Sequence, residues 1–237
     1  MAAPRLFSYK LTTDSGFAPN PFWGALTLAT CKPGMRRSKR VGDWIAGFTS
    51  RDLTGSAVGE EKLIFVMQVK NVLPFVAYYR AREFKAKIPV RGGDLRNAVG
   101  DNIYKPLVAD PRSSDDFEQN RYGCHTPDHQ HHDLSGKNVL TAVRFAYFGR
   151  GAIAIPDRVR PQIPAGQHPQ GYQTHDFRRV ARFIAYIEDI SGLEAALVDL
   201  PTDWPKDEPV PQGCGGVSQR FADPCSPKKP RRKARRC

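Results

Sequence analysis

The 237-residue chain lacks the short motifs of several common enzyme classes. It has no GxxxxGK[ST] phosphate loop, no GxSxG turn, no methyltransferase-like glycine loop, and no CxxC pair among its five cysteines. These absences argue against the common ATP-using, acyl-transfer and zinc-ribbon proteins. They leave room for an unfamiliar enzyme.

Long apolar segments are also missing. No run approaches the roughly 18 residues that cross a bilayer, and the first residues, "MAAPRLFSYKLTTD", contain no apolar leader. We therefore expect no membrane partner and a cytoplasmic location. The composition is 40% hydrophobic, which is enough for a folded core.

Positive charge is present in excess and is concentrated at the C-terminus. The formal net charge is +12, and seven cations fall within the last ten residues: Lys228, Lys229, Arg231, Arg232, Lys233, Arg235 and Arg236. Such a run either binds nucleic acid without sequence preference or is simply a solvated tail. We expect one globular domain over residues 1–200, a Pro/Gly-rich linker over 201–226 and a disordered basic tail over 227–237.

The pattern of apolar residues predicts a sheet followed by one strong helix. Leu6–Leu11 and Leu63–Val69 read as strands, as do stretches within "ALTLATC", "VGDWIAGF" and "NVLTAVRFAYFG". A helix is expected between an Asp176 cap and a Gly192 stop. Residues 88–133 show no regular pattern and predict a long loop. The fold class indicated is α+β, with a twisted or barrel-like mixed sheet and covering helices.

Two segments resemble a known family. "SGFAPNPFWGALTLATCKPGMRRSKRVGDWIAGF" (15–48) and "DLSGKNVLTAVRFAYFG" (133–149) are similar to the nucleotide modification associated domains, most closely the second numbered type. The resemblance extends over residues 6–190. That family was proposed from gene neighbourhoods of DNA-modification systems in phages and bacteria. The resemblance implies a role with modified nucleotides or DNA, possible partner proteins of such a system, and no particular reaction.

A second, smaller resemblance concerns the fold alone. The order from "VGDWI" to "LIFVMQVKNVL" resembles the start of small PUA and EVE barrels, several of which bind modified bases. It favours a PUA-like barrel among the possible sheets.

The segment 17–43 combines aromatic and basic residues in a way that suits a nucleotide. A base needs a stacking surface and a hydrogen-bonding edge, and a phosphate needs cations. The alternatives are a packed aromatic lid over the core, a solvated basic turn, and an aspartate that closes a turn. Cys31 is expected to be a buried residue at a strand end. The candidate nucleotide-binding residues are Phe17, Asn20, Phe22, Trp23, Lys32, Arg36, Arg37 and Asp43.

The segment "GCHTPDHQHHD" (123–133) is rich in possible ligands and bases. A structural zinc site needs two spaced ligand pairs, and no second pair is present. We therefore expect no metal, or, if one binds, ligation by His129, His132 and Asp133. The pair His132 and Asp133, with His175, is the candidate general-base set. The sequence does not define a cofactor.

Three functions follow from these residues. The first is a nucleotide- or DNA-directed module that binds a modified nucleotide in an aromatic, basic and His/Asp pocket, with DNA favoured. The alternative is a metal-assisted or general-base hydrolase or transferase acting on a nucleotide. The third is a structural partner in a modification complex.

Overall fold

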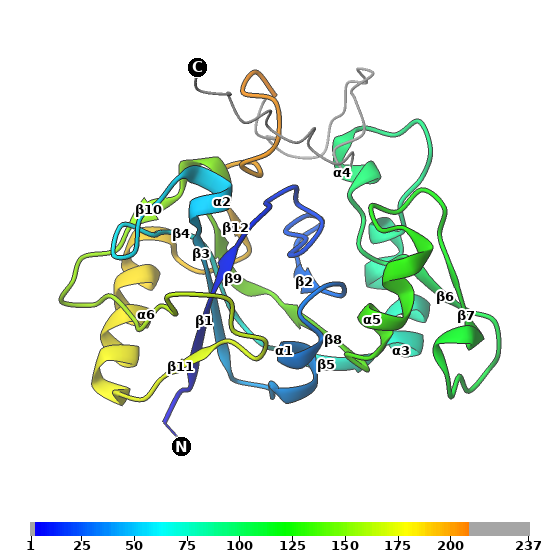
Figure 1. Cartoon of the computed structure of the whole chain (residues 1–237), viewed down its shortest axis with the longest axis horizontal. Helices are drawn as coiled ribbons and strands as arrows, with labels where there is room; N and C mark the ends of the chain where they lie inside the picture. The colour runs from blue at the N-terminus through cyan, green and yellow to red at the C-terminus, as the bar shows by residue number, and fades with distance from the viewer. Residues whose placement is uncertain (1–2, 209–237) are drawn as a thin grey trace, which may run out of the picture.

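Three sheets form the frame of the computed structural model, which describes residues 3–208 (Figure 1). The largest has seven strands within these residues, in the order β11-β1-β3-β4-β9-β12, with β10 paired to β4. Its strands are β1 (Leu6–Leu11), β3 (Trp44–Thr49), β4 (Lys62–Gln68), β9 (Arg144–Tyr147), β10 (Ile153–Ala154), β11 (Tyr172–Thr174) and β12 (Ala196–Leu197). β1 with β3 and β9 with β12 are parallel, and the other pairs are antiparallel.

Two smaller sheets complete the strands of the described residues. One has the order β2-β8-β5, and the other pairs β6 with β7. Their strands are β2 (Leu26–Leu28), β5 (Asn71–Pro74), β8 (Asn138–Ala142), β6 (Tyr104–Pro106) and β7 (Phe117–Gln119). The α+β class with a mixed sheet is confirmed. The large sheet is open within residues 3–208, with β11 and β12 at its ends, so it does not close into a barrel.

Short helices connect these strands, and one long helix follows them. The α-helices are α1 (Pro33–Ser38), α2 (Arg51–Thr54), α3 (Phe75–Arg80), α4 (Leu95–Ala98), α5 (Gln130–Leu134) and α6 (Phe177–Ser191). The 3-10 turns are η1 (Arg82–Lys87), η2 (Ser114–Asp116), η3 (Pro127–His129) and η4 (Gly149–Gly151). No helix among residues 3–208 is long and apolar enough to cross a membrane.

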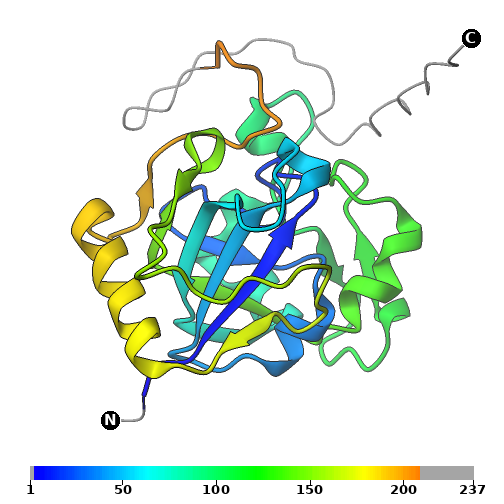
Figure 2. The same ribbon diagram turned by 60° about the vertical axis from the view of Figure 1, so that its left-hand side comes forward.

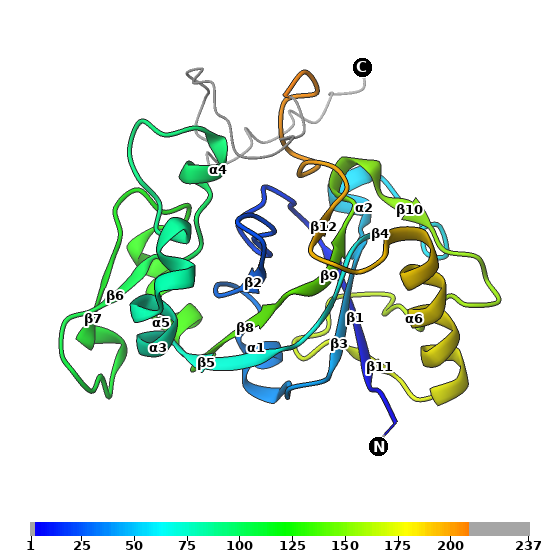
Figure 3. The same ribbon diagram turned by 180° about the vertical axis from the view of Figure 1, so that it is seen from behind.

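Alternating side chains on the central strands bury both faces of the large sheet. On β3, Trp44, Ala46 and Phe48 face α6, and Ile45 faces the opposite side. α6 lies along the outside of the sheet, as Figure 2 shows. The small sheet and the segments that carry α3, α4 and α5 lie on the other side (Figure 3). The second side is the one that holds the polar site described below.

Helix α6 confirms the signals in its sequence. The Asp176 carboxylate accepts hydrogen bonds from the backbone N–H groups of Arg178 and Arg179, and Gly192 has φ 70° just past the last turn. By contrast, the basic segment after Cys31 is the helix α1 and not a solvated hairpin turn. The segment 88–133 is likewise not structureless, because it contains α4, β6, β7, η2, η3 and part of α5.

Residues 201–208 pack against the domain. Trp204 is buried and stacks on Phe22 with ring centroids 5.2 Å apart, and its indole N–H donates to the Ser15 carbonyl. Asp14 accepts hydrogen bonds from Thr202. The remainder of the expected linker (209–226) and the basic tail (227–237) lie outside the described residues.

A buried lysine fixes the aromatic loop before β2. Lys87 is fully buried, and its ammonium donates to the Asn20 carbonyl, the Asn20 side-chain oxygen and the Ala25 carbonyl at 2.6–3.1 Å. Burial lowers the pKa of Lys87 to about 7, although the charge of Asp101 acts to raise it. These bonds hold the loop in a single position next to the chain that leads to Cys31.

We expect Lys87→Met to destabilise the fold by at least about 2 kcal/mol, because several buried oxygens lose their donor and each unsatisfied group costs about 1–3 kcal/mol. Urea denaturation measures the loss. The matched control is Lys85→Met, since Lys85 is exposed and makes one bond to the Tyr79 carbonyl. Equal effects of the two substitutions would show that the buried ammonium does not fix the loop.

Candidate active site

Three reactive side chains from distant parts of the chain meet at one point. The Cys31 sulfur lies 3.5 Å from His125 Nε2, and His125 Nδ1 lies 2.6 Å from Asp133 Oδ2. Cys31 is a free thiol and is partly exposed, whereas Asp133 is completely buried. The order thiol, imidazole, carboxylate is that of an activated nucleophile, its base and the group that orients the base.

Backbone geometry presents Cys31 at the start of a helix. The cysteine follows β2 and precedes α1, and both Cys31 and Lys32 have left-handed φ values, 53° and 39°. This conformation is costly for residues other than glycine and is found often at functional sites. The sharp turn directs the chain from the small sheet into α1 and leaves the thiol beside the His125 ring.

Asp133 is held by donors on both of its oxygens. Oδ1 accepts the Cys31 backbone N–H at 2.7 Å, and Oδ2 accepts the Tyr104 hydroxyl at 2.8 Å in addition to its contact with His125. A buried carboxylate requires such partners. The same contacts fix the position of the carboxylate relative to the cysteine backbone and to the imidazole.

A fully buried arginine connects the cysteine segment to the aspartate segment. Arg36 Nε donates to the Cys31 carbonyl at 2.8 Å, one terminal nitrogen donates to the Asp133 carbonyl at 2.5 Å, and the other donates to the Asn138 carbonyl at 2.9 Å. Gly136 gives the guanidinium its space, since a Cβ there would lie 2.4 Å from it. Burial lowers the pKa of Arg36 to about 10, although the nearby Asp133 charge opposes this.

The electrostatics of the cluster favour a charged imidazole. Burial alone would lower the pKa of His125, but the hydrogen bonds to Asp133 and to the Cys31 sulfur outweigh it and raise the pKa to about 9. Burial likewise opposes ionisation of Asp133, yet the bond and charge of His125 lower the pKa of Asp133 below its usual range. His125 is therefore well suited to take and hold the thiol proton.

The cluster opens into a cavity of about 540 Å³, called here the Cys31 cavity. Several imidazole and cationic side chains line it together with Cys31, His125 and Asp133: Lys10, Lys32, Arg37, His129, His132 and His168. Two buried polar atoms on its wall, the Tyr9 hydroxyl and His168 Nδ1, have no hydrogen-bond partner in residues 3–208.

Of the residues that the sequence nominates, some meet at this cavity. Lys32, Arg37, His129, His132 and Asp133 line it. The Phe17 ring is buried behind it and contacts His125 edge-on, with centroids 4.8 Å apart. Arg36 does not line the cavity, but its guanidinium donates to the backbone carbonyls of Cys31 and Asp133, which do.

The other nominated residues lie elsewhere. Asn20 and Phe22 are buried in the packing of the aromatic loop, and Trp23 is 36% exposed beside Lys87. Asp43 forms an ion pair with Arg5 at 2.6 Å and accepts the Arg40 backbone N–H.

His175 is exposed between β11 and α6 and is not among the residues that line the Cys31 cavity.

The thiol and His125 are the site residues that sequence reasoning does not find. The sequence predicts Cys31 to be a buried residue at a strand end, and the predicted general-base set of His132, Asp133 and His175 omits His125. The two positions are 94 residues apart, so no local spacing relates them. One signal was available, namely that the cysteine lies inside the first family-like segment and Asp133 begins the second.

The same cluster has the composition of a metal site. The ligand atoms of Cys31, His125 and Asp133 all lie within 4.8 Å of one another, and cysteine with histidine suits zinc. Because both Asp133 oxygens already accept hydrogen bonds, the carboxylate fits better as a partner of His125 than as a ligand. A metal on Cys31 and His125 would need more ligands, and the neighbouring His129 ring, 4.6 Å from His125, is the nearest imidazole in the described contacts.

The fold and the site define an α+β domain with a Cys-His-Asp cluster at a basic cavity. The family described as nucleotide modification associated domain 2 matches residues 3–208, and the chain belongs to this family. The family description connects the domain with nucleotide modification. Searches among curated proteins and among solved structures find no match.

We expect Gly136→Ala to lower the free energy of unfolding by about 2 kcal/mol or more, since the added methyl displaces the buried Arg36 guanidinium and leaves acceptors unpaired. Thermal and urea denaturation report the change. Gly166→Ala is the control, because nothing lies within 4 Å of a Cβ at that position. If Gly136→Ala is as stable as the control, the guanidinium is not held as tightly as its contacts indicate.

The pKa of His125 gives a pH dependence of stability. Its folded pKa of about 9 lies above the ordinary 6.5, so its stabilising contribution is complete below pH 6.5 and is lost as the pH rises through 9. The stability difference between the native chain and His125→Gln should therefore shrink by up to about 3 kcal/mol over this window. Titrating groups that do not contact His125, Lys87 included, cancel in the difference.

Urea denaturation at a series of pH values measures this difference. His175→Gln serves as the control, because His175 is exposed. A difference that is independent of pH between 6 and 10 would refute the coupling of His125 to Asp133.

Proposed function

We propose that this protein is an enzyme of nucleotide modification that uses Cys31 as a nucleophile. One observation carries the proposal: the Cys31 sulfur, His125 and Asp133 form a continuous line of contacts, 3.5 Å and 2.6 Å long, at the edge of a cavity. In enzymes with a nucleophilic cysteine, the thiol lies against a base, and a third group orients that base. An enzyme that acts on a nucleotide is therefore better supported than a protein that only binds one.

The chemistry follows from the roles of the three groups. His125 keeps Nδ1 toward Asp133, so Nε2 accepts the thiol proton. The thiolate then forms a bond to an electrophilic carbon of the nucleotide or of its attached group, and the displaced electron pair moves onto the neighbouring atom of the substrate. The imidazolium returns its proton to that atom or to the leaving group. Asp133 stabilises the imidazolium throughout and keeps its own charge.

Charge at the mouth supports a phosphate-bearing substrate. Lys32 and Arg37 line the Cys31 cavity with His129 and His132. Lys32 reaches across the Tyr9 ring and donates to Gln167, so its ammonium is fixed over the cavity wall. Cations and imidazoles in this arrangement suit the phosphate of a nucleotide, in agreement with the family.

Unpaired polar groups in the wall support a polar substrate. The Tyr9 hydroxyl and His168 Nδ1 are buried and have no partner within residues 3–208. An unsatisfied buried group costs about 1–3 kcal/mol, so a ligand that pairs with it regains this energy. Burial raises the pKa of Tyr9, which keeps its hydroxyl protonated as a donor.

The size of the cavity limits the form of the substrate. A volume of about 540 Å³ lies in the usual range for small-molecule sites and accommodates one nucleotide. A duplex does not enter, so a DNA substrate would present a single-stranded or flipped-out base. DNA remains the favoured polymer because the chain is basic, and other proteins of a modification system are possible partners.

Alkylation of Cys31 tests the activated thiol. We expect iodoacetamide to modify Cys31 at pH 7 on the order of tenfold faster than after His125→Gln, since the thiolate reacts and the imidazole takes its proton. Peptide mass spectrometry gives the rate at Cys31 itself. His175→Gln is the matched control and should react at the native rate. Equal rates in His125→Gln and the native protein would remove the support for a nucleophile.

Two further measurements distinguish the alternatives. Intact-mass spectrometry after incubation with nucleotides and single-stranded DNA, modified and unmodified, should detect an adduct that is absent in Cys31→Ala. Tight binding without adduct or turnover would instead support a binding module. One equivalent of zinc in the purified protein, lost in both Cys31→Ala and His125→Gln, would support the metal-assisted alternative.

A further inference from the structure

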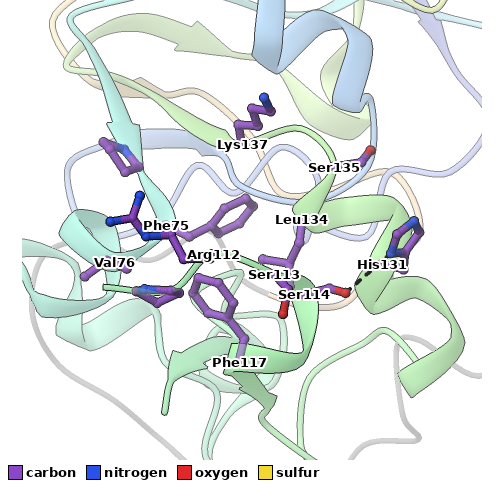
Figure 4. Close-up of a pocket in the computed structure, with 12 residues that line it drawn as sticks. Phe75, Val76, Arg112, Ser113, Ser114, Phe117, His131, Leu134, Ser135 and Lys137 are labelled. Carbon is purple, nitrogen blue, oxygen red and sulfur yellow. Dashed lines mark hydrogen bonds between the residues drawn. The ribbon is translucent and has the colours of Figure 1, made fainter. Parts of the chain in front are cut away.

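A second cavity lies on the other side of α5. It measures about 470 Å³ and is called here the Phe75 cavity. Its wall is formed by the end of β5 and start of α3, the loop before β7, and the residues from α5 to Lys137. Figure 4 shows the Phe75 and Phe117 rings next to each other in its centre, with Leu134 to one side and Arg112 to the other.

The Phe75 cavity combines an aromatic wall with cations. The two phenyl rings meet at 70° with centroids 6.2 Å apart, so one ring presents its face where the other presents its edge. Lys137 is exposed at the rim, and its ammonium makes no ion pair or hydrogen bond with residues 3–208. The Arg112 side chain is 82% exposed and pairs with Asp110. An incoming anion would compete with the Asp110 carboxylate for the Arg112 guanidinium.

Hydroxyl and imidazole groups add hydrogen-bonding capacity. Ser113, Ser114 and His131 line the cavity, and the Ser114 hydroxyl lies 3.4 Å from His131 Nδ1 (Figure 4). The nearby Asp116 carboxylate is occupied, because it accepts the backbone N–H groups of Arg112 and Ser113. The serine hydroxyls and the His131 ring can therefore donate or accept hydrogen bonds from a ligand in the cavity.

We propose that the Phe75 cavity is a second nucleotide-binding site. The base would lie against Phe75 and Phe117, and the phosphate would be held by Lys137 and Arg112. Aromatic side chains bind a planar base through its face, and cations beside them bind the phosphate. The shared chemistry is a base that carries phosphate, which either a free nucleotide or one unit of a single strand supplies.

The two cavities share a wall and a set of contacts. Asp133 of α5 faces the Cys31 cavity, while His131 and Leu134 of the same helix face the Phe75 cavity. Phe75 packs on the Arg36 guanidinium at 5.4 Å and edge-on against the Tyr104 ring at 5.7 Å. Both of these residues hold Asp133, so a base on Phe75 would lie against a ring that itself packs on the groups that position the His125–Asp133 pair.

Isothermal titration calorimetry of the full chain tests the proposal. Probes are the four deoxynucleoside monophosphates, the corresponding nucleosides, inorganic phosphate and a ten-residue single strand. We expect Arg112→Gln with Lys137→Gln to weaken one class of sites by about tenfold or more, and Val76→Trp, which fills the apolar wall, to remove that class. Arg51→Gln with Lys70→Gln is the control, since it removes the same charge at exposed positions elsewhere.

The outcomes separate this proposal from the one for Cys31. A second site is supported if one class of binding sites is lost in the Arg112→Gln/Lys137→Gln double variant and in Val76→Trp. The same class must be retained in the Lys32→Gln/Arg37→Gln double variant. The reverse pattern overturns it and leaves the Cys31 cavity as the binding site. Absence of nucleotide binding to the native chain, or no change in any Phe75-cavity variant, also overturns it. Binding of the monophosphates identifies free nucleotides as ligands, and binding of the strand alone identifies a polynucleotide.

Discussion

The buried carboxylate of Asp133 is the group on which the arrangement of the site depends. It accepts hydrogen bonds from the Cys31 backbone and the Tyr104 hydroxyl and contacts His125 Nδ1, so segments more than a hundred residues apart converge on two oxygen atoms. A charge buried without such partners would be very costly. These contacts hold the cysteine, the histidine and the aspartate in fixed relative positions without a substrate. Orientation of this kind is what the proposed nucleophilic chemistry requires.

The rest of the fold keeps these segments in place. The large sheet and α6 form an apolar support on one side, and the Lys87 network fixes the aromatic loop that precedes β2. The left-handed turn at Cys31 is tolerated because Arg36 binds the carbonyl on its far side. The energy gained by the apolar core thus offsets the strain and the buried charges of the polar side.

The sequence predicts the parts of this structure that depend on local signals. The helix 177–191 follows from a capping aspartate, apolar spacing and a terminal glycine, and β1 follows from an apolar stretch. The placement of Arg36 does not, because a charged run is normally a surface feature. Its burial is favourable because three carbonyls accept its hydrogen bonds, and two of these, from Asp133 and Asn138, belong to a segment about a hundred residues away. The contact of Cys31 with His125 is of the same kind. Neither residue has a neighbour in sequence that implies the other, so only the tertiary contact between the turn after β2 and the segment before η3 brings them together.

The short helix α5 forms part of the wall of both cavities. A helix of five residues has no stability of its own, so its position is set by tertiary contacts. On one side these are the Asp133 bonds and Arg36, and on the other the Gln130 amide donates to the carbonyls of Ser114 and Phe117. A ligand in either cavity therefore contacts α5, and the position of α5 also depends on the residues around the other cavity. Any difference in affinity for two positions of α5 would then couple the cavities through the orientation of the His125–Asp133 pair, and the coupling would act equally in both directions.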